Sequence, residues 1–354
     1  MNIAIDVSPI KNESLLKHRV RGTGFYIENL KRAIQQYYPD NQYTFFVRGE
    51  KLSKDIDLVH YPYFEPFFRT LPIIKKYKTI ITVHDLTPLV FPKYFSIGIK
   101  GSVKWQIQKL ALKSADSIIT DSECSKNDII KHTEVSPSRI HVVHLAASGE
   151  FKEIKSSKLK VKSLREKYVL PDKFVLYVGD VTWNKNLPRL VEAVKKINVT
   201  LVMAGSALVQ NDFDRSNPWN QDLLKVQKMV ENDKRIIRLG FVPTEDLVSI
   251  YNLATVFAMP SFYEGFGLPI LEAMSCGCPV VTTKEGSIPE VAGDAAYYVN
   301  AYDVNSIASG INKVFSDQKL QEELFLKGLK QAEKFSWKKT AEDTVRMYER
   351  ILVK

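Results

Sequence analysis

The chain has 354 residues, of which 45% are hydrophobic and 25% are charged, and its formal net charge is +10. This composition is typical of a globular protein with room for two domains and argues against a disordered or low-complexity chain. There is no run of 18 uncharged apolar residues and no C-x-x-C pair among the three cysteines, which argues against a membrane-spanning helix and a disulfide framework.

The first residues, M-N-I-A-I-D-V-S-P-I, have no basic residue ahead of the apolar run and carry Asp6 within it. They predict a buried first strand rather than a signal peptide. We therefore expect a cytoplasmic protein, with the inner face of the cytoplasmic membrane as a second location.

In the first half of the chain, short runs rich in β-branched residues alternate with segments of helical spacing, such as 25–34 and 105–113. A strand, a helix and a strand in succession predict a parallel sheet with helices on its faces. The expected strands are 2–7, 43–47, 57–61, 79–85, 117–122 and 140–144.

The pattern restarts after a lysine-rich stretch at 154–167, which is either a solvated face or a surface for an anionic partner. A helix is expected at 187–197, and strands at 174–179, 199–205, 236–240, 256–260 and 279–283. We therefore predict two doubly wound α/β domains facing across a cleft, with ligands at the carboxyl ends of the strands. The predicted boundaries are 1–160, 161–335 and a final amphipathic helix at 336–354 that can pack on either domain, including back on the first.

Residues 261–274, S-F-Y-E-G-F-G-L-P-I-L-E-A-M, follow one expected strand and place Glu264 and Glu272 eight positions apart. Pro269 is best placed in the first turn of a helix, which puts Glu264 in the loop and Glu272 in that first turn. Gly265 and Gly267 let the backbone approach a ligand at a helix N-terminus, which favours an anion. The alternative is a tight turn, with Glu272 interacting with the helix dipole.

Two other loops have similar features. In Y-V-G-D-V-T-W-N-K-N-L-P-R-L, Lys185 precedes a helix start and suits a phosphate, although a solvated lysine is the alternative. In R-V-R-G-T-G-F-Y, Gly22 and Gly24 are expected to precede a helix and to bring the backbone close to phosphate. This is a poor dinucleotide fingerprint, because the third glycine is missing and the loop is too long.

The spacing of Glu264 and Glu272 resembles the E-x7-E motif of family 4 retaining glycosyltransferases, which have the GT-B fold with two Rossmann-like domains. The resemblance extends over nearly the whole chain, through G-T-G-F-Y, T-V-H-D-L-T-P-L, Y-V-G with K-N, L-G-F-V and P-E-V-A-G-D. Within the family, H-D-L-x-P and K-N-L-x-R-L are most similar to mannosyltransferase-type members. The resemblance implies an acceptor-side first domain and a second domain that binds a nucleotide sugar.

The resemblance also implies roles for individual residues. Glu264 would bind hydroxyls of the donor sugar, Glu272 the ribose, and the backbone near Val242 the base. Lys185 would neutralise the departing diphosphate, helped by Gly24, and Gly22 would also bind the donor. His84 would lie near the donor sugar and the attacking hydroxyl, or else be a histidine capped by Asp85. Backbone amides on the sugar and diphosphate would come from Gly265, Phe266, Gly267 and Leu268.

The chain departs from the family pattern where many members have an arginine, because Asp180 and Asn184 occupy those places. The missing charge is either absent or supplied by Arg189, Arg19 or Arg21. No metal or other cofactor is expected: the D-x-D patterns at 55–57 and 212–214 are short and neither lies at a strand end beside the site.

The expected function is transfer of a sugar from a nucleotide sugar to a glycan or lipid-linked glycan acceptor in cell-surface polysaccharide synthesis. The favoured sugar is mannose, and the favoured donor is GDP-mannose. The alternatives are a catalytically weak nucleotide-sugar-binding relative and an NAD-dependent oxidoreductase. The basic and partly apolar segment 92–113 is either a peripheral contact with anionic lipid or an ordinary helix. Nucleic acid is not an expected partner, because only the charge suggests it.

Overall fold

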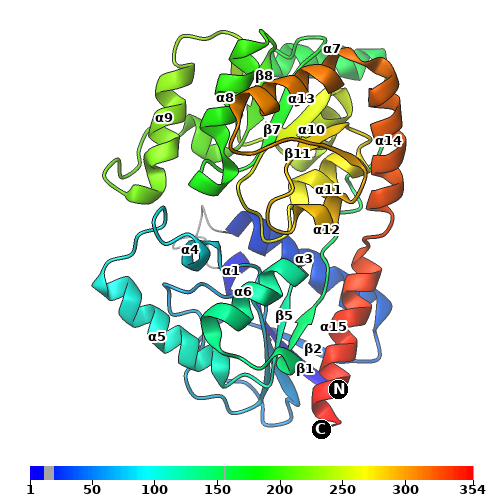
Figure 1. Cartoon of the computed structure of the whole chain (residues 1–354). Coiled ribbons are helices and arrows are strands. Elements are labelled where there is room, and N and C mark those ends of the chain that lie inside the picture. The colour runs from blue at the N-terminus through cyan, green and yellow to red at the C-terminus, as the bar shows by residue number, and fades with distance from the viewer. Residues whose placement is uncertain (12–19, 155–156, 354) are drawn as a thin grey trace. The chain divides into compact units, whose positions relative to one another are not determined.

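The computed structural model describes residues 1–11, 20–154 and 157–353, and the chain divides into two compact units. The first unit comprises Met1–Pro92, Ile97–Ala146 and Phe335–Lys354; the second comprises Lys93–Ser96 and Ala147–Lys334. The second unit thus begins at Ala147, ahead of the predicted boundary at 161. The final helix groups with the first unit (Figure 1).

The described part of the first unit contains a six-stranded parallel sheet in the order β2-β1-β3-β4-β5-β6. Its central strands are buried along almost their whole length because helices cover both faces of such sheets. The strands are β1 Asn2–Asp6, β2 Gln42–Phe46, β3 Leu58–Tyr61, β4 Lys78–Thr82, β5 Ser117–Thr120 and β6 Ile140–Val142. The helices are α1 Ser8–Lys11, α3 Val20–Tyr37, α4 Thr87–Val90, α5 Ile99–Lys113, α6 Glu123–Thr133 and α15 Trp337–Leu352.

Helix α15 packs against α3 within this unit (Figure 1). Ser336 caps its N-terminus by accepting a hydrogen bond from the Lys339 amide. Tyr348 is buried and its hydroxyl lies 2.8 Å from Nδ1 of His60, whose Nε2 lies 2.8 Å from Thr82 Oγ1. Burial lowers the pKa of His60 to about 3, so this bridge between sheet and helix is uncharged at neutral pH.

The described part of the second unit contains a six-stranded parallel sheet in the order β12-β11-β10-β7-β8-β9. The chain starts in the middle at β7, winds outward to β9, returns beside β7 as β10 and winds outward to β12. This is the strand order of a dinucleotide-binding Rossmann sheet. The strands are β7 Val175–Val178, β8 Leu201–Ala204, β9 Ile236–Gly240, β10 Val256–Met259, β11 Val280–Thr282 and β12 Ala296–Tyr298.

The helices of the second unit have buried apolar stripes at the predicted spacing. In α8, residues Leu187, Leu190, Val191 and Val194 are all fully buried, which is the i, i+3, i+4, i+7 pattern of a helix on a sheet. The helices are α7 Lys158–Tyr168, α8 Leu187–Lys196, α9 Gln221–Val230, α10 Thr244–Leu253, α11 Leu268–Ser275, α12 Ile288–Ala292, α13 Val304–Ser316 and α14 Gln318–Ala332.

The prediction of two α/β domains with parallel sheets is confirmed, and the ends of the predicted strands differ from the observed ends by at most three residues. Strand β12 was not predicted. The prediction that Gly22 and Gly24 precede a helix is wrong, because α3 begins at Val20 and both glycines lie within its first turns. None of the helices in the described ranges has a stretch long and apolar enough to cross a bilayer.

Candidate functional site

The loops after β7 and β10 meet at the point where the second sheet reverses its winding direction. These strands are neighbours in the sheet, yet their following helices, α8 and α11, continue towards opposite edges. In open α/β sheets the ligand crevice lies at the carboxyl ends of the strands at this switch point. The two loops hold Lys185 and Glu264, so both residues lie where the topology favours a ligand crevice.

Lys185 and Glu264 form a close ion pair at this position. Lys185 Nζ donates to both carboxylate oxygens of Glu264, at 2.9 and 2.7 Å, and the two side chains are 20% and 7% exposed. Ser261 Oγ donates to the same carboxylate at 2.6 Å. The alternative of a solvated lysine is therefore wrong for the described structure, and Ser261 is a site residue that the sequence analysis missed.

The same two loops are joined by hydrogen bonds through Asn184. Its side-chain Nδ2 donates to the backbone carbonyl of Tyr263 at 3.0 Å, and its backbone carbonyl accepts a hydrogen bond from the Phe262 amide at 2.8 Å. Asn184 is buried and joins the two loops at the position where many family members have an arginine. Asp180, the other departure, is exposed.

Trp183, which precedes Lys185 by two residues, is the centre of an aromatic stack. The Trp183 ring stacks on Tyr94 with centroids 3.7 Å apart and on Phe262 at 4.8 Å. Arg189 lies over the Phe262 ring at 5.0 Å and donates to Asn186 Oδ1. Arg189 is one of the three arginines that could supply the missing charge, and its guanidinium group lies over an aromatic ring. Arg19 and the Arg21 side chain lie outside the described structure.

The glycine-rich segment after Glu264 leads into α11. Gly267 is the N-cap of that helix with a φ of +95°, a conformation that favours glycine. Gly286 approaches the segment from the β11–α12 loop with a φ of +60°, and a Cβ there would lie 2.7 Å from the Glu264 carbonyl oxygen. Next to it, the Ser287 hydroxyl donates to that same carbonyl at 2.9 Å. The backbone at Glu264 is therefore packed against the β11–α12 loop and hydrogen-bonded to it.

Glu272 lies in the second turn of α11 rather than in the first, because the helix begins at Leu268. Its carboxyl group is buried and accepts a hydrogen bond from the Tyr251 hydroxyl at 3.0 Å. Burial raises the pKa of Glu272 to about 8. Val242, proposed to mark the base-binding backbone, is buried in the loop between β9 and α10, at the carboxyl edge of the same sheet.

In the first unit, His84 follows β4 and is held by Asp121, which follows the neighbouring strand β5. The distance from Nδ1 to Asp121 Oδ2 is 2.7 Å. Burial opposes protonation of the ring, but the Asp121 carboxylate outweighs it and raises the pKa of His84. Tyr26 packs edge-on against the imidazole at 4.7 Å. The Nε2 atom of His84 is buried and has no hydrogen-bond partner within the described part of the chain.

The expected capping of His84 by Asp85 is wrong, because Asp85 instead accepts the Thr87 amide at 2.8 Å at the start of α4. Asp121 was missed, although its position just after a β-branched strand could have indicated it. In the D-x-D patterns, Asp57 accepts the Asn2 amide and Asp214 accepts the Ser216 amide and hydroxyl. Across the described ranges, no group of three His, Cys, Asp or Glu side chains could hold a metal ion.

Both halves of the chain match known protein families. Residues 161–331 match the family described as Glycosyl transferases group 1, and residues 10–147 match Glycosyltransferase Family 4. The chain is 34% identical to O-antigen chain mannosyltransferase B of Escherichia coli over 277 residues, which are 77% of this chain and 70% of that protein. It is 31% identical to the serotype-specific mannosyltransferase WbdA of Escherichia coli over 78% of this chain, which spans only 34% of WbdA.

Solved structures share the fold over the whole chain. Sucrose-phosphate synthase from Thermosynechococcus elongatus matches with a TM-score of 0.76 at 18% identity, covering 100% of this chain and 99% of the other. HepE from Anabaena in complex with UDP and glucose matches with a TM-score of 0.75 at 16% identity, covering 99% and 100%. At these identities the likeness concerns the fold.

Proposed function

The chain belongs to family 4 of the glycosyltransferases, with the GT-B fold, and from this premise we propose that it is a retaining mannosyltransferase. The donor is GDP-mannose and the acceptor is a glycan or lipid-linked glycan of a cell-surface polysaccharide. The observation that carries the proposal is the Lys185–Glu264 pair at the switch point of the second sheet. The mannosyltransferase names of the relatives support the sugar, whereas HepE in its complex holds UDP, so the base needs a direct test.

Lys185 and Glu264 act on the donor as one unit. The ammonium group of Lys185 donates to both oxygens of Glu264, so a diphosphate that binds beside this carboxylate meets the positive charge of Lys185. Glu264, held by Ser261, accepts hydrogen bonds from sugar hydroxyls through its remaining lone pairs. Lys185 stabilises the negative charge that develops on the departing diphosphate, and the α11 N-terminus adds its partial positive charge.

Glu272 binds the ribose and the backbone around Val242 binds the base. A buried carboxyl group that has lost its water is an unfavourable feature of an empty site. In the free protein the Glu272 carboxyl group accepts a hydrogen bond from the Tyr251 hydroxyl, and the two ribose hydroxyls supply further hydrogen bonds to it. The energetic cost of burying Glu272 is thus recovered when the nucleotide binds.

His84 binds a hydroxyl group of the reacting sugars through Nε2. Because Asp121 accepts the Nδ1 proton, the neutral ring presents Nε2 as an acceptor. In the transfer step the bond between the anomeric carbon and the diphosphate oxygen breaks, and the bond to the acceptor oxygen forms on the same face. The acceptor proton passes to the leaving diphosphate, so no protein nucleophile is required.

Helix α5 is the element that we propose for peripheral membrane contact. Its side chains Ile99, Val103 and Leu110 are exposed large hydrophobic groups, and beside them Lys100 is exposed and Lys104 is half-buried. Such a surface suits a bilayer that contains anionic lipid. Co-flotation with phosphatidylglycerol vesicles tests this, and equal flotation of an Ile99→Ser, Val103→Ser variant would contradict it.

The transfer reaction is tested with a panel of nucleotide sugars, by following release of nucleoside diphosphate in the presence of mannan-type oligosaccharide acceptors. Lys185→Ala and Glu264→Ala should abolish most of the release, and the matched control Lys330→Ala, an exposed lysine on α14, should keep it. Release from GDP-mannose alone among the donors confirms the donor; release from UDP-glucose instead would overturn it.

The alternative of a catalytically weak nucleotide-sugar-binding protein is motivated by Asn184, which occupies an expected arginine position and is committed to joining the two loops. It predicts tight binding of a nucleotide sugar by calorimetry without diphosphate release on any acceptor. The family assignment leaves the dehydrogenase alternative without support.

A further inference from the structure

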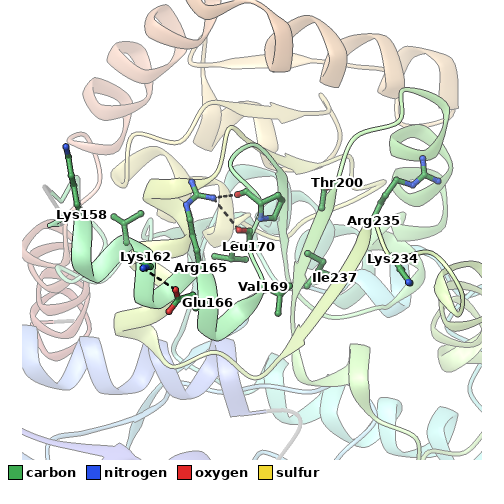
Figure 2. A pocket seen from close by; sticks show the side chains of 12 residues that line it. Lys158, Lys162, Arg165, Glu166, Val169, Leu170, Thr200, Lys234, Arg235 and Ile237 are labelled. Atoms are coloured by element: carbon green, nitrogen blue, oxygen red, sulfur yellow. Dashed lines mark hydrogen bonds and ion pairs between the residues drawn. The ribbon is translucent and has the colours of Figure 1, made fainter.

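A cavity lies in the second unit, at the end of the strands opposite to the loops that hold Lys185 and Glu264. It has a volume of about 870 Å³ and is lined by α7, by the loop that precedes β7, and by the starts of β8 and β9 (Figure 2). These are the amino ends of parallel strands, whereas the candidate site lies at their carboxyl ends. The cavity is therefore a separate feature, and its volume is within the range of about 300–1,000 Å³ that is usual for ligand pockets.

The middle of the cavity is apolar and its two sides are basic. Figure 2 shows Val169, Leu170 and Ile237 between a side formed by α7, with Lys158, and a side formed by the start of β9, with Lys234. Both lysines are exposed and neither has an ion-pair partner among the residues that the structure describes. An apolar centre with unpaired cations on opposite sides is complementary to an anionic amphiphile.

The other charged groups of the lining are already engaged. Arg165 donates to the carbonyls of Leu170 and Pro171, and Arg235 pairs with Asp233 at 2.8 Å. Lys162 lies 3.9 Å from Glu166, a loose and exposed pair. The cations available to a ligand are thus Lys158 and Lys234 first, and Lys162 second.

Val169 gives a second and independent indication. Helix α7 ends with the Leu170 amide bonded to the Arg165 carbonyl at 2.9 Å, which places Val169 at the left-handed position that glycine usually occupies. Its φ is +53°, which is strained for a β-branched residue, and the residue is 75% exposed. An exposed valine in a strained conformation contributes little to folding. An apolar contact with a ligand would explain its presence at the mouth of the cavity.

We propose that this cavity binds one molecule of an anionic phospholipid, with its apolar part along Val169, Leu170 and Ile237 and its phosphate at one of the two basic sides, on Lys158 or on Lys234. The site is a lipid-binding site distinct from the membrane contact of α5, and it does not depend on the transfer reaction. A soluble phosphate would not contact the apolar centre, and an uncharged lipid would not neutralise the lysines.

The test is calorimetric titration with dihexanoyl phosphatidylglycerol below its micelle concentration, using the full chain. Binding should be saturable at one site, and dihexanoyl phosphatidylcholine and inorganic phosphate should each bind at least about tenfold more weakly. Lys158→Glu with Lys234→Glu should weaken binding at least about tenfold. The control pair Lys319→Glu with Lys330→Glu on α14 changes the net charge equally and should leave affinity unchanged.

Val169→Gly separates the ligand contact from folding. Glycine relieves the left-handed strain, so the variant should melt at the same or a higher temperature than the parent while binding the lipid several-fold more weakly. Unchanged affinity in Val169→Gly, equal loss in the control pair, or no binding by the parent would each overturn the proposal. Phosphate binding as tight as lipid binding would replace the lipid with a soluble anion.

Discussion

Asp121 Oδ2 lies 2.7 Å from Nδ1 of His84, although the two residues are 37 positions apart in the sequence. The pair forms because β4 and β5 are neighbouring parallel strands, so the residues that follow them meet at one edge of the sheet. This geometry orients the imidazole and directs Nε2 away from Asp121. Asp121 is therefore a positioning residue for His84 in the proposed transferase.

Asp121→Asn should lower both the pKa of His84 and the turnover number. The carboxylate that stabilises the imidazolium is lost, so the ring deprotonates at a lower pH. The rate is expected to rise with pH as His84 loses its proton, and in the variant this rise should occur at lower pH. The maximum rate should fall about tenfold or more, because the ring is no longer oriented.

The measurement is kcat against pH together with an NMR titration of the His84 ring. Asp116→Asn is the matched control, because Asp116 precedes the same strand β5 at its other end and accepts the Thr79 amide. An unshifted His84 titration in Asp121→Asn would show that the carboxylate does not control the ring.

Glu272→Gln should stabilise the fold and weaken nucleotide binding. The unfolded carboxyl group titrates near about 4.3, whereas burial raises the folded pKa to about 8. Between these values the folded state binds more protons, so the free energy of unfolding of the parent falls as pH rises. The variant lacks this pH dependence, so its free energy of unfolding should exceed that of the parent by about 4 kcal/mol at pH 8, with little difference at pH 4.

Denaturant unfolding at several pH values measures this effect, and calorimetry with GDP measures the binding loss, which we expect to be about tenfold. Tyr251→Phe, which removes the hydroxyl partner of Glu272, should raise the carboxyl pKa further. A parent whose stability is flat between pH 5 and pH 8 would contradict the assignment of a buried, neutral Glu272.

Lys185→Ala should reduce both stability and turnover. The Glu264 carboxylate, which is 7% exposed in the parent, keeps Ser261 as its remaining hydrogen-bond partner among those described. The free energy of unfolding should fall by about 1–3 kcal/mol, a modest loss for a buried pair because Lys185 is itself partly solvated. The turnover number should fall about a hundredfold, because the leaving diphosphate loses its cation.

The double variant Lys185→Ala, Glu264→Ala tests whether the two residues act as a unit. Its loss of turnover should be clearly smaller than the sum of the two single losses expressed as free energies. Strict additivity would mean that the two side chains contact the donor independently, despite the ion pair in the free protein.

Gly286→Ala should impair turnover without touching a proposed ligand contact. The new Cβ would lie 2.7 Å from the Glu264 carbonyl oxygen and 2.9 Å from its amide nitrogen, at a φ of +60°. The Glu264 backbone must then move, and we expect turnover to fall at least about tenfold. Gly149→Ala is the control within the same unit, since nothing lies within 4 Å of its added Cβ. Equal effects of the two substitutions on turnover would refute the role of Gly286.

The amino-acid sequence by itself determined the class of fold and indicated the loops that hold the candidate site. Period-two and period-3.6 apolar patterns are local, so the strands and helices could be predicted to within a few residues. Glycine and proline are also local signals, and they indicated the Glu264 loop before α11. The family pattern then added the roles expected of Lys185, Glu264 and His84.

The tertiary structure decided which side chains become partners. Asp121 at His84, Ser261 at Glu264 and Tyr251 at Glu272 are supplied by packing, and two of these three pairs join different strands or helices. The order of the strands determined the switch point, and the start of β9 and helix α7 together line the cavity. No local pattern contains these facts, because strand order and side-chain contact depend on how distant segments pack together in the folded chain.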